Sequence, residues 1–225
     1  SAARNTVVVA GGGFTGIETA TEMPARLRAV LGENADIRVI VVDRAPQVAA
    51  ALGDGIRPSI VEASEHLGIQ WVLNATVAAV DANGVTLADG QRIESNTVIW
   101  TVGFRANSLT EQVQGTRDHQ GRLHVDQHLK VRGHADVYAS GDVAYAATDD
   151  LGNFAAMSCQ HAIALGRHAG NNVAAELLGV EPIAYSQPKY VTCVDLGAWG
   201  AVFTEGWDRQ VKLVKHEAKE LKTQI

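Results

Sequence analysis

Residues 6–18 read TVVVAGGGFTGIE, and this stretch decides the fold of the chain. The uninterrupted apolar run Val7–Ala10 is typical of a strand covered on both faces, and the glycines after it lead into a helix expected to reach about Leu31. A kink or restart is expected at Pro24, because proline lacks an N–H and clashes with the preceding turn. A strand, a glycine-rich turn and a helix in this order predict a nucleotide-binding unit.

The spacing of Gly11, Gly13 and Gly16 fits the dinucleotide fingerprint GxGxxG. The first glycine makes the tight turn, the second lets the backbone approach a pyrophosphate, and the third lets the helix pack closely on the strand. The start of the helix, at Phe14 and Thr15, supplies unpaired N–H groups and a partial positive charge to the phosphates. These five residues are predicted to bind a dinucleotide; a merely structural glycine turn is the alternative.

The elements that follow continue the order βαβαβ, which requires a parallel sheet with right-handed crossovers. A second strand is expected at Ile37–Val42, a helix at Ile56–Leu67 and a third strand at Ile69–Leu73. Asp43, at the end of the second strand, would accept hydrogen bonds from a ribose. It would repel a 2′-phosphate by about 4 kcal/mol, for unit charges about 4 Å apart at an effective dielectric near 20. NADH is therefore favoured over NADPH, although the adjacent Arg44 is suited to stacking on adenine or accepting a 2′-phosphate.

Tight-turn dipeptides after the third strand indicate an antiparallel meander. Asn83-Gly84 and Asp89-Gly90 supply the positive φ angles of hairpin turns. The strand Thr97–Val102 then returns to the sheet and ends at Gly103, which places a domain boundary near Phe104. The meander strands are expected at Ala75–Val80, Gly84–Leu87 and Gln91–Ile93.

Fewer elements are expected in the second half of the chain. A short strand at Val137–Ala139 leads into Ser140-Gly141-Asp142, and one long helix runs from Phe154 to Leu178, with Gly179 in the C′ position. Small antiparallel strands are expected at Lys189–Asp195, Ala198–Phe203 and Gln210–Val214, followed by a helix at His216–Lys222.

Composition narrows the function classes. A net charge of −6, with no Lys/Arg cluster longer than a pair, argues against nucleic acid as a partner. No apolar run approaches the ~20 residues of a membrane-spanning helix, and peripheral membrane contact is left open. Two cysteines 34 residues apart make a disulfide framework unlikely, so a cytoplasmic location is the default. Cys159 and Cys193 lie in no redox motif, and His124 and His128 lack companion ligands, so no metal site is predicted.

Two acidic positions stay ambiguous on residue chemistry alone. Glu18 would complement the helix dipole; a place near the reactive end of a nicotinamide is the functional alternative. Gly141-Asp142 would let the aspartate project from a sheet edge into a ligand crevice, but Gly-Asp is also common in turns.

Together these motifs resemble the two-dinucleotide-binding flavoproteins of the pyridine nucleotide–disulfide oxidoreductase superfamily. The resemblance lies in VVVAGGGFTGIE with its Glu18, in the closing strand NTVIWTVG (Asn96–Gly103) and in ADVYASGDVA (Ala135–Ala144). It covers roughly Thr6 to Leu178. It implies an NADH oxidoreductase with FAD and NAD(H) as cofactors.

The resemblance also implies an α/β fold in three parts. A Rossmann-like NAD(H)-binding domain with an antiparallel meander would span residues 5–103, the remaining part of an FAD-binding domain 104–179, and a small α+β region on the acceptor or membrane side 180–225. Glu18 and Gly103 would lie near the nicotinamide–flavin contact, and Gly141 and Asp142 would hold FAD.

Within the superfamily the chain is similar to the type II NADH dehydrogenases (NADH:quinone oxidoreductases), through IESNTVIWTVGFRAN, the helix Ser158–Asn172 and HEAKELKTQI. This implies hydride transfer from NADH to FAD, then electron transfer to a quinone or another small acceptor, with Gln160 on the quinone side. It also implies peripheral contact with the inner face of the membrane; a homodimer stays open. Cys159 and Ala164 depart from the family's Ala-Gln pair and second glutamine, which weakens the case for quinone.

A flavoprotein of this type needs a first glycine fingerprint for FAD. The only other close glycine pair, Gly53-x-Gly55, lacks the strand and the third glycine. The chain is therefore expected to be the C-terminal part of a longer protein, inactive alone. A sulfide:quinone oxidoreductase-like enzyme, kept open by Cys159 and Cys193, and a non-enzymatic NAD(H)-sensing or interaction module are the alternatives.

Overall fold

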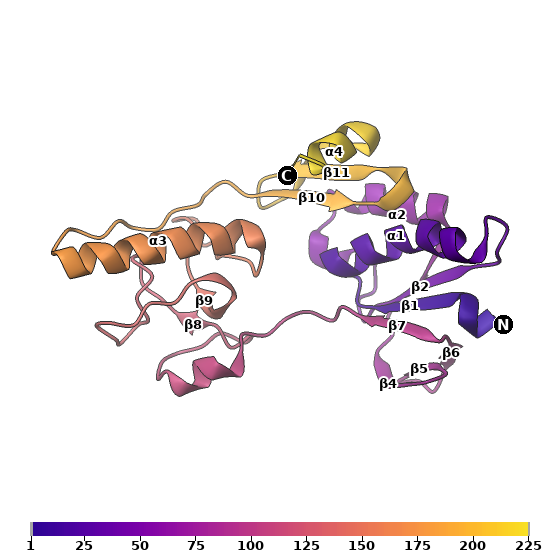
Figure 1. Ribbon diagram of the computed structural model, residues 1–225, viewed down its shortest axis with the longest axis horizontal. Coiled ribbons are helices and arrows are strands. Elements are labelled where there is room, and N and C mark those ends of the chain that lie inside the picture. Colours follow the sequence, from indigo (N-terminus) through magenta and orange to yellow (C-terminus); the bar gives the residue numbers. More distant parts are fainter. Residues whose placement is uncertain (1, 225) are drawn as a thin grey trace. The chain divides into compact units, whose positions relative to one another are not determined.

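A computed structural model describes residues 2–224, which form two compact units (Figure 1). The first unit runs to Gly103 and also contains the segment from Val191 onwards. The second unit is Phe104–Tyr190.

A four-stranded parallel sheet forms the centre of the first unit, in the order β3-β2-β1-β7. β1 (Thr6–Ala10) pairs with β2 (Arg38–Val42) and with β7 (Thr97–Trp100), and β2 pairs with β3 (Ile69–Val72). Every residue of β1 is buried, as expected of a parallel strand covered on both faces. The predicted α/β class is confirmed.

Alternate side chains of this sheet enter two cores. Val9 and Val41 pack with helix α1 (Phe14–Leu31), while Val8 and Ile40 pack with the meander on the other face. α1 continues through the buried Pro24 as a single helix. The second helix, α2, spans Arg57–Leu67, and the antiparallel meander consists of β4 (Val77–Asp81), β5 (Gly84–Leu87) and β6 (Arg92–Glu94).

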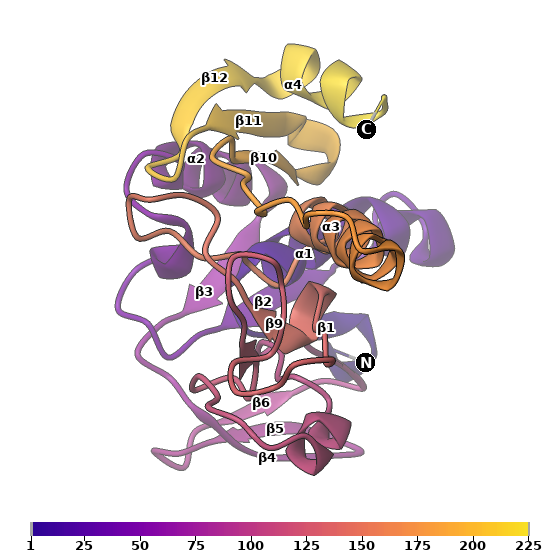
Figure 2. The same cartoon turned by 90° about the vertical axis from the view of Figure 1, so that its left-hand side faces the viewer.

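The C-terminal segment forms a further layer over α1 and α2 (Figure 2). Its antiparallel strands are β10 (Val191–Asp195), β11 (Ala201–Glu205) and β12 (Gln210–Val214), and helix α4 (Lys215–Lys222) follows. A buried cluster joins the segment to the helices through Val194, Leu196, Trp199 and Val202 on one side and Ile17, Ile56 and Ile60 on the other.

Little regular structure occurs in the second unit. It holds the short parallel pair β8 (Leu123–His124) and β9 (Ala144–Tyr145) and one long helix, α3 (Cys159–Leu178). Its core is an apolar cluster that includes Leu123, Leu129, Val131 and Leu165. Short 3-10 helices lie at η1 (Ala2–Asn5), η2 (Ala50–Leu52), η3 (Ser108–Gln112), η4 (Gly141–Val143) and η5 (Gly197–Trp199).

Two expectations for the second unit were wrong. The long helix begins at Cys159, not at Phe154, because Phe154 forms a bridge with Ala147 and its ring stacks on Tyr145 at 4.2 Å. No strand forms at Val137–Ala139, where the chain makes only an isolated bridge between Tyr138 and Lys130. Both segments follow tertiary contacts that local sequence does not reveal.

Candidate functional site

The glycine turn between β1 and α1 has the geometry of a phosphate-binding loop. Gly11 has φ +105°, and a Cβ atom there would lie 2.7 Å from the carbonyl oxygen of Thr101. A Cβ on Gly16 would overlap the carbonyl oxygen of Gly11 and lie 2.8 Å from Thr101 Oγ1. Around Gly13, by contrast, nothing described lies within 4 Å of such an atom. The first and third glycines therefore serve packing, and the second leaves open space for a ligand.

The start of α1 also suits an anion. Gly13 is the N-cap residue, no side chain among the described residues caps the helix there, and the first turn contains no acid. Phe14 is half-buried and Thr15 is exposed. Unsatisfied N–H groups and the positive end of the helix dipole therefore face the open space beside Gly13.

Asp43 lies directly beside this turn. Its Oδ2 accepts a hydrogen bond from the Gly12 N–H at 2.5 Å, and its Oδ1 accepts one from the Ala45 N–H at 2.7 Å. The ring of Trp71 also crowds Gly12, where a Cβ would lie 2.8 Å from Trp71 Cζ3 and 2.9 Å from Asp43 Oδ2. Each carboxylate oxygen has a second lone pair for a ribose hydroxyl. Arg44 is exposed next to it.

The end of β7 completes this edge of the sheet. Thr101 Oγ1 lies 2.8 and 3.1 Å from the carbonyl oxygens of Ala10 and Gly11, which share its one hydrogen. Gly103, with φ +82°, is exposed two residues further on. The carboxyl ends of β1, β2 and β7 thus meet at the glycine turn, where ligands bind in open α/β sheets.

Glu18 is bound by the C-terminal segment. Its Oε1 accepts hydrogen bonds from the Asp195 N–H at 2.9 Å and from Lys222 Nζ at 3.0 Å. Lys219 Nζ in turn holds both carboxylate oxygens of Asp195, at 2.6 and 2.7 Å. Sequence reasoning missed these partners, because they lie 177 and 204 residues from Glu18 and carry no local motif.

The remaining predicted residues belong to the second unit. Gly141, with φ +64°, and the exposed Asp142 lie in η4. A Cβ on Gly141 would lie 3.7 Å from Ala162 Cβ, so η4 packs on the first turns of α3. Gln160, half-buried in the first turn of α3, accepts a hydrogen bond from Gln187 Nε2 at its backbone oxygen. Gly141, Asp142 and Gln160 are therefore neighbours in one unit.

A buried histidine follows Gln160 in α3. His161 Nδ1 lies 3.0 Å from Ser158 Oγ, and its ring stacks 5.5 Å from the ring of Tyr190. Burial lowers the pKa of His161 and favours the neutral imidazole. Cys159 and Cys193 are free thiols, and no cluster of three or more metal-ligating side chains occurs within residues 2–224.

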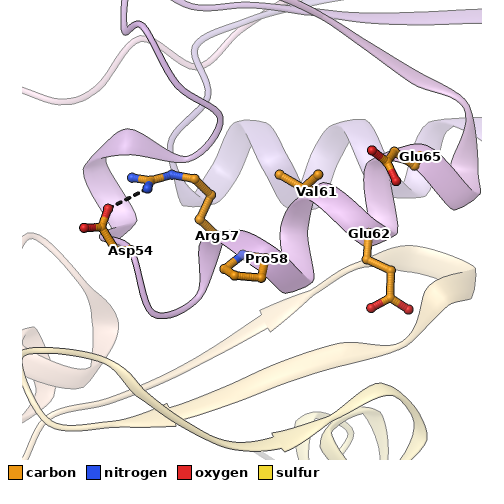
Figure 3. Close-up of a pocket in the computed structure, with 6 residues that line it drawn as sticks. All are labelled: Asp54, Arg57, Pro58, Val61, Glu62 and Glu65. Atoms are coloured by element: carbon orange, nitrogen blue, oxygen red, sulfur yellow. Dashed lines mark hydrogen bonds and ion pairs between the residues drawn. The ribbon is translucent and has the colours of Figure 1, made fainter.

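A hollow of about 450 Å³ lies on the outer face of α2 (Figure 3). None of the predicted site residues lines it, and Arg57 is bound to Asp54 there at 2.5 Å. It therefore plays no part in the glycine-turn site. Its lining residues are Asp54, Arg57, Pro58, Val61, Glu62 and Glu65.

Comparison with known proteins places the chain in a family. Residues 1–166 match the family model described as pyridine nucleotide-disulphide oxidoreductase. The whole chain is 44% identical to an NADH dehydrogenase-like protein of Mycobacterium tuberculosis and covers 56% of it. A type II NADH:quinone oxidoreductase of the same species is 30% identical over 79% of the chain, which covers 40% of that protein. The chain thus spans about half the length of these curated relatives.

Solved structures agree on the fold. The chain superimposes on an FAD-dependent pyridine nucleotide-disulphide oxidoreductase from Desulfovibrio vulgaris with a TM-score of 0.69 at 20% sequence identity. The match covers 89% of this chain and 49% of the other.

Proposed function

The chain belongs to the pyridine nucleotide-disulphide oxidoreductase family, and we propose that it is the NADH-binding part of a flavin-dependent NADH dehydrogenase. The observation that carries the proposal is the glycine turn, where Gly11 and Gly16 pack without room for a side chain while Gly13 stays open. That arrangement leaves space for a diphosphate against the start of α1.

Backbone and side chains divide the binding of NADH between them. The N–H groups at the start of α1 would bind the diphosphate, and Asp43 would accept hydrogen bonds from the adenosine ribose. Because Gly12 and Ala45 already fix the Asp43 carboxylate, a 2′-phosphate would meet its charge in place. This supports NADH over NADPH as the substrate.

Glu18 and Gly103 would lie at the nicotinamide end. Lys222 and the Asp195 N–H hold one oxygen of Glu18, so the carboxylate has a fixed orientation. Glu18 is proposed as a group beside the reacting end of NADH.

FAD would be held in part by Gly141 and Asp142 in η4. When bound, it would accept the hydride of NADH and pass the two electrons to an acceptor. The relative named type II NADH:quinone oxidoreductase supports a quinone as that acceptor. Gln160 on the quinone side and peripheral contact with a membrane are further parts of the proposal. Within residues 2–224, no helix is both long and apolar enough to span one. The same proposal includes the division into an NAD(H)-binding domain (5–103), part of an FAD-binding domain (104–179) and an acceptor-side region (180–225). It also includes the need for a second FAD-binding part.

Calorimetric titration of this chain tests the proposal. NADH should bind, ADP-ribose should bind with comparable affinity through the shared diphosphate, and NADPH should bind more weakly by about 100-fold or more. A folded chain that binds neither NADH nor NADPH would refute the assignment. Adding FAD in a second titration tests whether Asp142 and its neighbours retain flavin on their own.

A further inference from the structure

Arg209 lies in the turn between β11 and β12 and contacts Phe14, at the proposed NADH site, and the segment that follows Asp43. Its guanidinium carbon is 5.4 Å from the centroid of the Phe14 ring, and its Nη1 donates to the Leu52 carbonyl oxygen at 3.1 Å. Phe14 is the first residue of α1, directly after Gly13. Leu52 ends η2, in the segment that links Asp43 to α2. One side chain thus bridges the phosphate turn and the segment that follows the ribose-binding acid.

The backbone around Arg209 is built for this close approach. Arg209 has φ +52°, in the left-handed region that non-glycine residues rarely adopt. A Cβ on Gly55 would lie 3.0 Å from the Arg209 carbonyl oxygen, so the turn sits directly on the segment after η2. Phe14 packs on the same cluster as Leu52 and Val202, which joins α1 to the C-terminal strands. The contact is therefore anchored on both sides.

The charge of Arg209 also points to an anion. A cation near a helix N-terminus lies on the unfavourable side of the helix dipole. Arg209 stands over the side chain of Phe14, the first residue of α1, all the same. A bound diphosphate would reverse the sign of that interaction.

We propose that Arg209 is a positioning residue for NADH, through which the C-terminal turn holds Phe14 and the Leu52 segment in the geometry that binds the diphosphate. This inference rests on the proposed function. It makes the C-terminal segment part of the dinucleotide site.

Variants of this chain separate a positioning role from a structural one. Arg209→Met removes the charge and the hydrogen bond, and Arg209→Lys keeps the charge only. Lys215→Met is the matched control, because Lys215 also belongs to the C-terminal segment. It lies over the Trp199 ring at 5.3 Å and pairs with Glu62 of α2 at 2.8 Å. Calorimetry measures NADH and ADP-ribose affinity, and thermal unfolding measures stability.

Arg209→Met should weaken NADH binding about threefold to thirtyfold, the range set by cation–π contacts, and weaken ADP-ribose by the same factor. The NADH affinity of Arg209→Lys should lie between those of Arg209→Met and the wild type. The NADH affinity of Lys215→Met should stay within twofold of the wild type. The double variant Phe14→Leu/Arg209→Met should lose less affinity than the two single losses multiplied.

Equal NADH affinity in the wild type, Arg209→Lys and Arg209→Met would overturn the inference, as would an equal loss in Lys215→Met. Arg209→Lys carries the test if Arg209→Met fails to fold. A folded wild type that ignores NADH would instead refute the proposed function, so the two failures are distinguishable.

Discussion

Gly16 and Gly13 differ in what surrounds them, and alanine at each position should separate packing from binding. In Gly16→Ala the new methyl group meets the Gly11 carbonyl oxygen and lies 2.8 Å from Thr101 Oγ1. The Gly11 oxygen is backbone and cannot rotate away, so β1 and α1 must move apart. Overpacking of this kind costs about 1–3 kcal/mol, and at roughly 2–4 °C per kcal/mol for a chain of this size the melting temperature should fall by roughly 2–12 °C.

Gly13→Ala is the matched control. Gly13 has φ −79° and ψ −174°, which alanine adopts freely, and nothing described lies within 4 Å of the new methyl group. The gain in backbone entropy, about 0.4–1 kcal/mol, opposes the poorer N-cap that alanine makes. Stability should therefore stay within about 1 kcal/mol of the wild type.

NADH affinity should fall in both variants. In Gly13→Ala the methyl group occupies the space where the backbone meets the diphosphate, and a clash of about 1–3 kcal/mol weakens binding roughly fivefold to 150-fold. Calorimetric titration and thermal unfolding on the same samples give both quantities. Unchanged NADH affinity in Gly13→Ala would refute the reasoning about the phosphate site. An unchanged melting temperature in Gly16→Ala would refute the packing.

Three further substitutions test charges. Asp43→Asn should weaken NADH binding and reduce the difference in affinity between NADH and NADPH, because the carboxylate that repels the 2′-phosphate is lost. The ratio of the two dissociation constants measures this difference. Lys222→Met should lower the free energy of unfolding by at most about 1 kcal/mol, since the ion pair with Glu18 is about one-third exposed. The same substitution in a Glu18→Gln variant should lower it by less than in the wild type. Asp118→Asn should cost up to about 3–5 kcal/mol in thermal unfolding, because the buried Arg122 guanidinium loses its carboxylate and keeps only the Ala155 carbonyl oxygen and the Tyr145 ring. Burial alone would raise the pKa of Asp118, but hydrogen bonds from Arg122 outweigh burial and lower that pKa. The ionised Asp118 therefore contributes its full stability above the unfolded pKa of about 3.9, and this contribution is lost as the pH falls through the folded pKa. Acid unfolding of the wild type and of Asp118→Asn measures the difference.

The parts of the fold with continuous apolar patterns were predictable. The strand expected at Ile37–Val42 is Arg38–Val42, and the helix expected at Ile56–Leu67 is Arg57–Leu67. Parallel strands are buried on both faces, so their apolar runs need no tertiary information. The start of α3 was not predictable in this way, because the Ala155 N–H is taken by the Ala146 carbonyl oxygen at 2.9 Å. A distant partner there decides the conformation.

In the candidate site, too, residues within one local motif were predictable and residues that depend on distant contacts were not. Gly16 and Asp43 could be predicted as candidates from sequence, because their proposed roles depend on spacing within one βαβ unit, and both lie at the glycine turn in the structure. Arg209 and Lys222 were not, because each reaches α1 from the far end of the chain. Lone basic residues carry no motif, and most of them are solvated surface charges.

The C-terminal segment binds α1 along a single face, and this couples it to the predicted ligand. Phe14 contacts Arg209, and Glu18 contacts Lys222. Thr21 Oγ1 lies 3.3 Å from the Asp195 carbonyl oxygen, besides its closer acceptors within α1. The positions 14, 18 and 21 follow helical spacing, so one face of α1 carries all three contacts while its N-terminus would bind the diphosphate. Linkage is reciprocal: if the segment supports NADH binding, bound NADH must stabilise the segment by the same free energy. NADH should therefore slow amide hydrogen exchange in β10, β11 and β12, and Arg209→Met should abolish most of that slowing. If saturating NADH leaves the exchange rates of these strands unchanged, the segment contacts the site but is not energetically coupled to NADH binding.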